Sequence, residues 1–120
     1  MQRILIIEDN PMIVKSLEFK LSKDGYHVVT AIDGREAMNI LGEQSFDLVL
    51  TDLMLPFVTG NQLIKHIKES SPETSIIVLS TSKQEKTIME AFNFGVDDFI
   101  TKPFNPNELT LRVKRSLKKI

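Results

Sequence analysis

The sequence contains no cysteine, no marked excess of either charge and no long hydrophobic segment. Without cysteine the chain forms no disulfide and offers no thiolate to a metal, which is compatible with a reducing compartment. Fifteen basic residues stand against sixteen acidic ones, which argues against whole-surface binding to nucleic acid or anionic lipid. The longest early apolar run, residues 4–7, is too short for a signal peptide or a membrane span. We therefore expect a cytoplasmic protein with no direct nucleic-acid or membrane contact.

The length and the apolar pattern predict one α/β domain over residues 1–120. A chain of 120 residues with 42% hydrophobic content suits one core and leaves no room for a second domain. Short runs rich in Val and Ile alternate with stretches of helical periodicity, as in a parallel sheet covered on both faces. Asn10 and Asn105, each followed by proline, predict helix starts. The predicted strands are residues 3–7, 26–31, 48–51, 75–79 and 98–101.

Polar residues follow four of the predicted strands. Glu8 and Asp9 follow the first strand, Asp52 the third, Ser80 the fourth and Lys102 the fifth. Because the carboxyl ends of parallel strands share one edge of a doubly wound sheet, these side chains should meet there. If the first and third strands are neighbours, as in the flavodoxin-like order 2-1-3-4-5, Asp9 and Asp52 lie close together.

The chemistry of this group of residues favours Mg²⁺ and phosphoryl transfer. Carboxylates held together repel one another, and a cation relieves the repulsion. Oxygen ligands without histidine or cysteine favour Mg²⁺, which keeps open coordination positions for a phosphoryl group. Lys102 would neutralise charge on that group, and Ser80 would donate a hydrogen bond to it. Taken singly, an acidic pair or a Lys-Pro step is usually a turn, so the prediction depends on their joint occurrence.

Four segments resemble the response regulator receiver family of two-component signal transduction, in its chemotaxis-receiver-like form. They are RILIIEDN at 3–10, FDLVLTDLMLP at 46–56, SIIVLSTS at 75–82 and GVDDFITKPF at 95–104, and the likeness covers essentially all 120 positions. It implies a five-stranded (βα)5 fold and a phosphorylation switch with Mg²⁺ as cofactor. A histidine kinase or a histidine phosphotransfer protein would supply the phosphoryl group. The output partner is not indicated.

The resemblance also implies roles for individual residues. Asp52 would be the phosphoacceptor, and Lys102 would contact the phosphoryl group. Asp9 would bind the metal directly and Glu8 through water, together with the Asp52 carboxylate and the main-chain carbonyl of Met54. Apart from phosphoryl transfer to itself and slow self-dephosphorylation, such a domain is not an enzyme.

The implied conformational switch consists of Ser80 and Phe99, and the peptide bond between Lys102 and Pro103 is implied to be cis. Three positions depart from the commonest family pattern. Ser80 stands where threonine is commoner, and Phe99 stands where tyrosine is frequent, which removes a hydroxyl group. Met54 occupies a position where many members carry a polar side chain that orients the hydrolytic water.

Three alternative functions are compatible with parts of the pattern. A flavodoxin-like cofactor protein would carry a hydroxyl- and glycine-rich phosphate loop after its first strand. The loop at 8–11 begins instead with two acidic residues, which would repel a phosphate. A hydrolase of the haloacid dehalogenase type would carry D-x-D where this chain has Glu-Asp-Asn. A pseudo-receiver would have lost some of Asp9, Asp52 and Lys102, and all three are present.

The charges expected at the output face predict the oligomeric state. Family members joined to winged-helix DNA-binding domains dimerise through the fourth helix, the fifth strand and the fifth helix, a face expected to change on phosphorylation. Such dimers use paired charges across a two-fold axis. Four of these charged positions are kept here: Asp97, Asp98, Arg112 and Lys114. Lys86 and Ile88 stand where an acid and a base are usual, so a self-complementary interface loses pairs worth ~0.2–1 kcal/mol each. We expect a monomer that dimerises at most weakly when phosphorylated.

Overall fold

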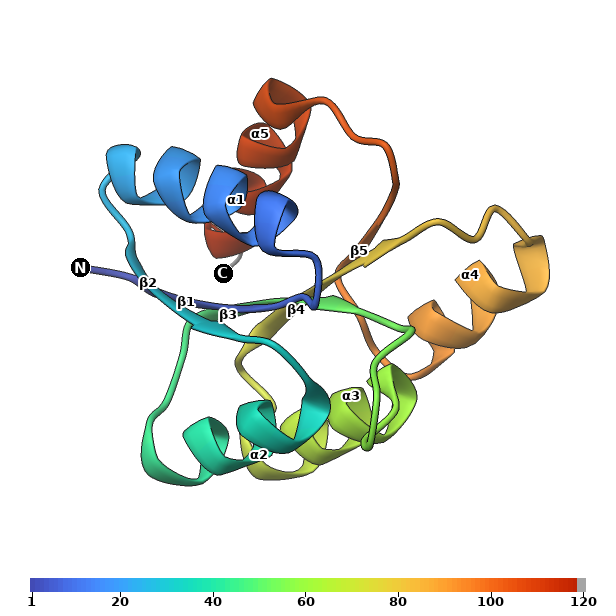
Figure 1. Ribbon diagram of the computed structural model, residues 1–120. Coiled ribbons are helices and arrows are strands. Elements are labelled where there is room, and N and C mark those ends of the chain that lie inside the picture. The colour runs from blue at the N-terminus through green and yellow to red at the C-terminus, as the bar shows by residue number, and fades with distance from the viewer. Residues whose placement is uncertain (119–120) are drawn as a thin grey trace.

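The computed structural model describes residues 1–118 and has a parallel sheet at its centre (Figure 1). Within these residues five strands lie in the order β2-β1-β3-β4-β5, which confirms the predicted doubly wound fold. Residues 119–120 of the predicted domain lie outside the described residues. The strands are β1 (Arg3–Ile7), β2 (His27–Ala31), β3 (Leu48–Asp52), β4 (Ser75–Ser80) and β5 (Asp98–Thr101).

The helices cover both faces of the sheet (Figure 1). On one face lie α1 (Pro11–Lys23) and α5 (Pro106–Leu117), and on the other lie α2 (Gly34–Glu43), α3 (Gly60–Ser70) and α4 (Glu85–Asn93). None of the helices formed by residues 1–118 combines the length and hydrophobicity needed to span a membrane. Loops at the sheet's carboxyl edge join each strand to the helix that follows it, from β1–α1 to β5–α5.

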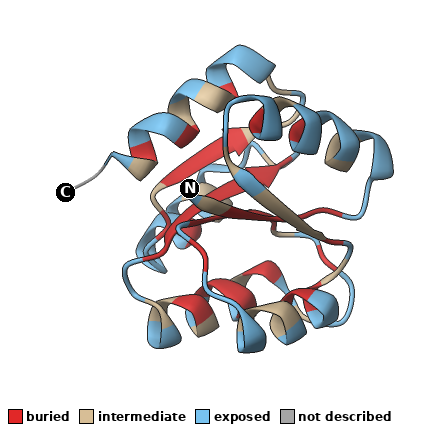
Figure 2. Ribbon diagram, turned by 90° about the vertical axis from the view of Figure 1, so that its left-hand side faces the viewer, coloured by how far each residue is buried: buried red, intermediate tan, exposed pale blue. Residues whose placement is uncertain are grey.

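Alternate residues of each central strand enter opposite halves of the core. In β1, Ile4 and Ile6 face α1 and α5, whereas Leu5 and Ile7 face the helices on the other side. All four are at most 1% exposed, and burying such a side chain contributes about 1.5–3 kcal/mol. Figure 2 shows this buried sheet between helices whose outer surfaces are exposed. The sheet is therefore a rigid support for the residues at its carboxyl edge.

Two strands extend one residue further than predicted. Asp52 is the last residue of β3 and pairs with β4, and Ser80 is the last residue of β4 and pairs with β5. The prediction ended each strand where the apolar run stopped, but ladder hydrogen bonds use main-chain groups and tolerate a polar side chain. Tyr26, predicted to begin the second strand, lies just before β2, which begins at His27.

The structure confirms both predicted helix caps. The Asn10 side chain accepts a hydrogen bond from the Met12 amide at 2.9 Å, and Asn105 accepts one from the Asn107 amide at 2.9 Å. A cap of this kind contributes about 1 kcal/mol. Each cap also fixes where its helix begins after a strand, so the loops β1–α1 and β5–α5 keep a defined path at the carboxyl edge.

Candidate functional site

Three carboxylates meet at the carboxyl edge of the sheet. Glu8 and Asp9 follow β1, and Asp52 ends the neighbouring strand β3. One oxygen from each of these side chains lies within 4.8 Å of the other two. Glu8 and Asp52 are buried, at 1% and 8% exposure, while Asp9 is exposed to solvent. The two strand ends thus form an acidic cluster that is closed on the protein side and open on the solvent side.

The Lys102 ammonium lies between two of these carboxylates. Its nitrogen is 2.5 Å from Oε1 of Glu8 and 2.8 Å from Oδ2 of Asp52. The side chain is only 11% exposed, so solvent screens these contacts weakly. Lys102 follows β5, its amide donates to the Ser80 carbonyl at 2.8 Å, and the peptide bond between Lys102 and Pro103 is cis. Ends of the first, third and fifth strands are thereby joined by one cation.

Burial and charge pairing act in opposite directions on the pKa values of this group. Burial raises the pKa of the Glu8 carboxyl, and the Lys102 ammonium and the Asn10 amide offset only part of that rise. Burial alone would lower the pKa of Lys102, but its hydrogen bonds to Asp52 and Glu8 outweigh this effect and raise it. Lys102 therefore remains a cation while it is held against the two carboxylates.

The second oxygen of Asp52 is held by the loop that follows β3. The Met54 amide donates to Oδ1 of Asp52 at 2.9 Å, while the Met54 side chain is 75% exposed. The loop returns close to its start, because the Gly60 amide donates to the Leu53 carbonyl at 3.2 Å. A Cβ atom at Gly60 would lie 2.5 Å from Cα of Leu53, so the close return requires glycine. Both oxygens of Asp52 consequently have hydrogen-bond donors.

Ser80 lies at the end of β4 and is 1% exposed. Its hydroxyl oxygen accepts a hydrogen bond from the Ser82 amide at 3.1 Å, which shapes the start of the loop between β4 and α4. The Ser80 carbonyl is the group that accepts from the Lys102 amide. The hydroxyl is thus held by its own loop, and it lies on the strand between Asp52 and β5.

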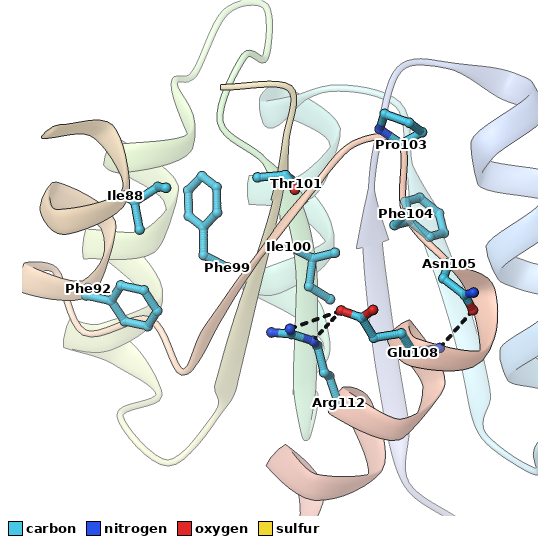
Figure 3. Close-up of a pocket in the computed structure, with 10 residues that line it drawn as sticks. All are labelled: Ile88, Phe92, Phe99, Ile100, Thr101, Pro103, Phe104, Asn105, Glu108 and Arg112. Carbon is cyan, nitrogen blue, oxygen red and sulfur yellow. Dashed lines mark hydrogen bonds and ion pairs between the residues drawn. The ribbon is translucent and has the colours of Figure 1, made fainter. Parts of the chain in front are cut away.

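Phe99 points inward from β5 and is 9% exposed. Figure 3 shows its ring facing Ile88 of α4, with Phe92 on the same side. These residues line a cavity of about 250 Å³ between α4, β5 and α5, with Arg112 at its rim. The Phe99 ring therefore forms part of the cavity wall between α4 and β5.

Asp98 forms ion pairs within the chain, and one of them is with Arg112, which the sequence also places on the expected dimer face. Its Oδ1 lies 2.8 Å from Arg112 and its Oδ2 lies 3.3 Å from Arg115. Arg112 also contacts Glu108 at 3.0 Å, one helical turn earlier on α5. Arg115 was not predicted as a partner, because only the fold places it and Arg112 on the side of α5 that faces the start of β5.

The donor set of the acidic cluster fits Mg²⁺. It consists of carboxylate oxygens at the ends of two adjacent strands, and its outer member, Asp9, is open to water. Mg²⁺ binds such oxygen ligands, uses few protein carboxylates and keeps several waters. The neighbouring ammonium of Lys102 reduces the repulsion among the carboxylates without removing it, since it supplies a single positive charge.

Comparisons with known proteins agree with this geometry. Residues 4–114 match the model of the response regulator receiver domain. The alkaline phosphatase synthesis transcriptional regulatory protein PhoP of Bacillus subtilis is 34% identical over 118 residues, covering 98% of this chain and 49% of that protein. The non-phosphorylated receiver domain of HemR from Leptospira biflexa is 30% identical with a TM-score of 0.94, covering 100% of this chain and 97% of that one.

Response regulator DrrB of Thermotoga maritima, described as an OmpR/PhoB homologue, is 37% identical with a TM-score of 0.91. The match covers 98% of this chain and 53% of DrrB. The chain therefore spans about half the length of PhoP and of DrrB.

Proposed function

The chain belongs to the response regulator receiver family, and we propose on this basis that Asp52 receives a phosphoryl group from a histidine kinase or a histidine phosphotransfer protein. The single observation that carries the proposal is the position of the Asp52 carboxylate between Lys102 and the rest of the acidic cluster. A single domain over residues 1–120 and a cytoplasmic location are parts of the same proposal. The output would be exerted through a further domain or a separate protein.

In the proposed step, one Asp52 oxygen forms a bond to phosphorus while the bond between phosphorus and the donor's imidazole nitrogen breaks. The leaving nitrogen keeps the electron pair, and the product on Asp52 is an acyl phosphate. Lys102 would neutralise charge on the transferred group, and a hydrogen bond from Ser80 would orient it. Because Asp52 is consumed and regenerated only by slow hydrolysis, the domain acts as a phosphoacceptor and not as a conventional enzyme.

The proposed metal ligands are Asp9, Asp52 and the main-chain carbonyl of Met54, with Glu8 acting through water. When bound, Mg²⁺ would supply positive charge next to the phosphoryl oxygens. The chain's own residues orient the site: the Met54 amide holds one Asp52 oxygen, and the Asn10 amide donates to Glu8 at 3.1 Å. The buried Glu8 carboxylate in turn holds Lys102 next to Asp52.

The proposed signal is a change in the face formed by α4, β5 and α5. Ser80 would turn its hydroxyl from the Ser82 amide to the phosphoryl group, and the loss of that hydrogen bond would allow the β4–α4 loop to change shape. The Phe99 ring is already buried, so its part in the switch would be a shift inside the cavity next to Ile88. A downstream partner would respond only if it binds the two conformations with different affinities.

Intact-mass analysis after incubation with acetyl phosphate or phosphoramidate and Mg²⁺ tests the proposed function. Wild-type protein should gain one phosphoryl group, and Asp52→Asn should gain none. Asp24→Asn is a matched control, because it makes the same change at an exposed position beyond α1. Equal labelling of wild type and Asp52→Asn would refute the assignment of Asp52.

A further inference from the structure

The loop that follows the proposed phosphoacceptor contains an unusual backbone conformation. Among residues 1–118, Phe57 is the one non-glycine residue with a positive φ, at 70°. This left-handed conformation brings Cβ too close to the main chain, and it is rare for bulky residues. The Phe57 side chain is also 67% exposed, so burial of the ring does not compensate for the strain. Another interaction must hold the residue in place.

That interaction comes from the start of α2. The Arg35 guanidinium carbon lies 3.9 Å from the centre of the Phe57 ring, within the range of a cation–π contact. The preceding residue, Gly34, packs against the neighbouring loop residue, since a Cβ atom there would lie 2.5 Å from the Val58 carbonyl oxygen. The first two residues of α2 therefore contact two consecutive residues of the β3–α3 loop.

The same loop carries the groups that surround Asp52. It begins at Leu53 and Met54, whose amide holds Asp52, and it ends where Gly60 returns to Leu53. Phe57 lies between these two fixed points. We infer that Arg35 is a positioning residue: by stacking on Phe57 it ties the β3–α3 loop to α2 and thereby keeps the Met54 amide on the Asp52 carboxylate. Where the proposed function holds, the same contact supports Mg²⁺ binding by Asp52 and Met54.

Amide hydrogen exchange followed by NMR measures the first consequence directly. Arg35→Ala and Phe57→Leu each remove the stacked pair, and Phe57→Leu keeps a branched, apolar side chain at the strained position. We expect the Met54 amide to exchange about two- to five-fold faster in either variant, the range supported by a cation–π contact at an exposed site. Because the two residues act as a pair, the double variant should exchange no faster than the single variants.

A magnesium titration of the same samples measures the second consequence. The dissociation constant for Mg²⁺ should rise by a similar factor in both variants, by about two- to five-fold. Lys23→Ala is a matched control, because it removes another exposed cation–ring contact, the one between Lys23 and Phe19 at 5.9 Å, on α1. This control should leave both the Met54 exchange rate and the Mg²⁺ affinity unchanged.

The outcomes separate this inference from the proposed function and from a general effect on stability. Unchanged Met54 exchange in Arg35→Ala and Phe57→Leu would overturn the inference. Faster exchange that extended equally to core amides such as those of Ile64 and Val113 would also overturn it, because that pattern reports global destabilisation. Failure of wild-type protein to bind Mg²⁺ would count against the proposed metal site, while Met54 exchange would still decide the role of Arg35.

Discussion

Replacing Lys102 by alanine should destabilise the metal-free protein, because the ammonium is the counter-charge of two buried carboxylates. Its nitrogen contacts Glu8 at 2.5 Å and Asp52 at 2.8 Å. Glu8 is 1% exposed. Without Lys102, the Asn10 amide would be the remaining donor of the two hydrogen bonds that Glu8 accepts within residues 1–118. Lys102, which the family resemblance places in contact with the phosphoryl group, therefore has a structural role as well.

The magnitude follows from the burial of the pair. Removing one partner of a buried ion pair costs roughly 3–5 kcal/mol. The cost is smaller here, since Asp9 opens the cluster to solvent and Glu8 can take up a proton. We expect a loss of about 2–3 kcal/mol near neutral pH for Lys102→Ala. For a domain of this size that corresponds to a fall in melting temperature of roughly 6–15 °C.

The loss of stability should depend on pH with a definite sign. Burial already raises the pKa of Glu8 above its unfolded value, and loss of the Lys102 ammonium should raise that pKa further. A carboxyl whose pKa is raised in the folded state binds its proton more tightly there than in the unfolded chain. Protonation of Glu8 therefore adds to the free energy of unfolding fully below the carboxyl's pKa in the unfolded chain. This stabilisation is lost as the pH rises through the carboxyl's pKa in the folded protein. The difference between Lys102→Ala and wild type should therefore narrow from pH 7 toward pH 5.

Thermal unfolding followed by far-UV circular dichroism tests this prediction, and it suits a chain without tryptophan. Mg²⁺ should restore more stability to Lys102→Ala than to wild type, because at the proposed metal site it would replace the missing positive charge, and a ligand that binds only the folded state stabilises it. Lys65→Ala, at an exposed position of α3, is the control and should melt close to wild type. A variant that melts like this control, or a difference that widens toward pH 5, would refute the reasoning.

Two further predictions concern the metal and the oligomeric state. In a magnesium titration by NMR, Asp9→Ala should weaken binding more than Glu8→Ala, because Asp9 is proposed as a direct ligand and Glu8 as an outer partner. Unchanged affinity in both variants would show that the acidic pair forms only a turn and has no part in metal binding. Analytical ultracentrifugation should show a monomer without phosphorylation and at most a weak dimer with beryllofluoride and Mg²⁺. We expect this because Asp98 already pairs with Arg112 inside the chain. A tight dimer in both conditions would contradict the predicted oligomeric state.

The parts of the fold that follow from local pattern could be predicted from the sequence. The apolar runs located all the described strands to within one residue at either end. The Asn-Pro steps at 10–11 and 105–106 located two helix starts, because a capping side chain and a proline in the first turn act within a few residues. The meeting of Glu8, Asp9 and Asp52 was predictable as well, since parallel strands share one carboxyl edge.

Contacts that depend on side-chain geometry across the fold could not be predicted. Lys102 was expected near Asp52, but its bond to Glu8 depends on how far each side chain extends over the sheet edge. The conformation of Phe57 has no signal in the sequence, because left-handed residues are usually glycine or asparagine. Its contact with Arg35 joins residues 22 positions apart, and only the packing of α2 against the β3–α3 loop brings them together.

The charges at the sheet edge suggest where the conformational change would begin. Three carboxylates and one ammonium leave two negative charges for a divalent cation to balance. Phosphorylation would replace the single charge of Asp52 by about two negative charges on the phosphoryl group. Lys102 already contacts Asp52, so its ammonium would be drawn from Glu8 toward the new oxygens. Because the Lys102 amide is bonded to the Ser80 carbonyl, that movement would act on the ends of β4 and β5, where the proposed switch residues lie.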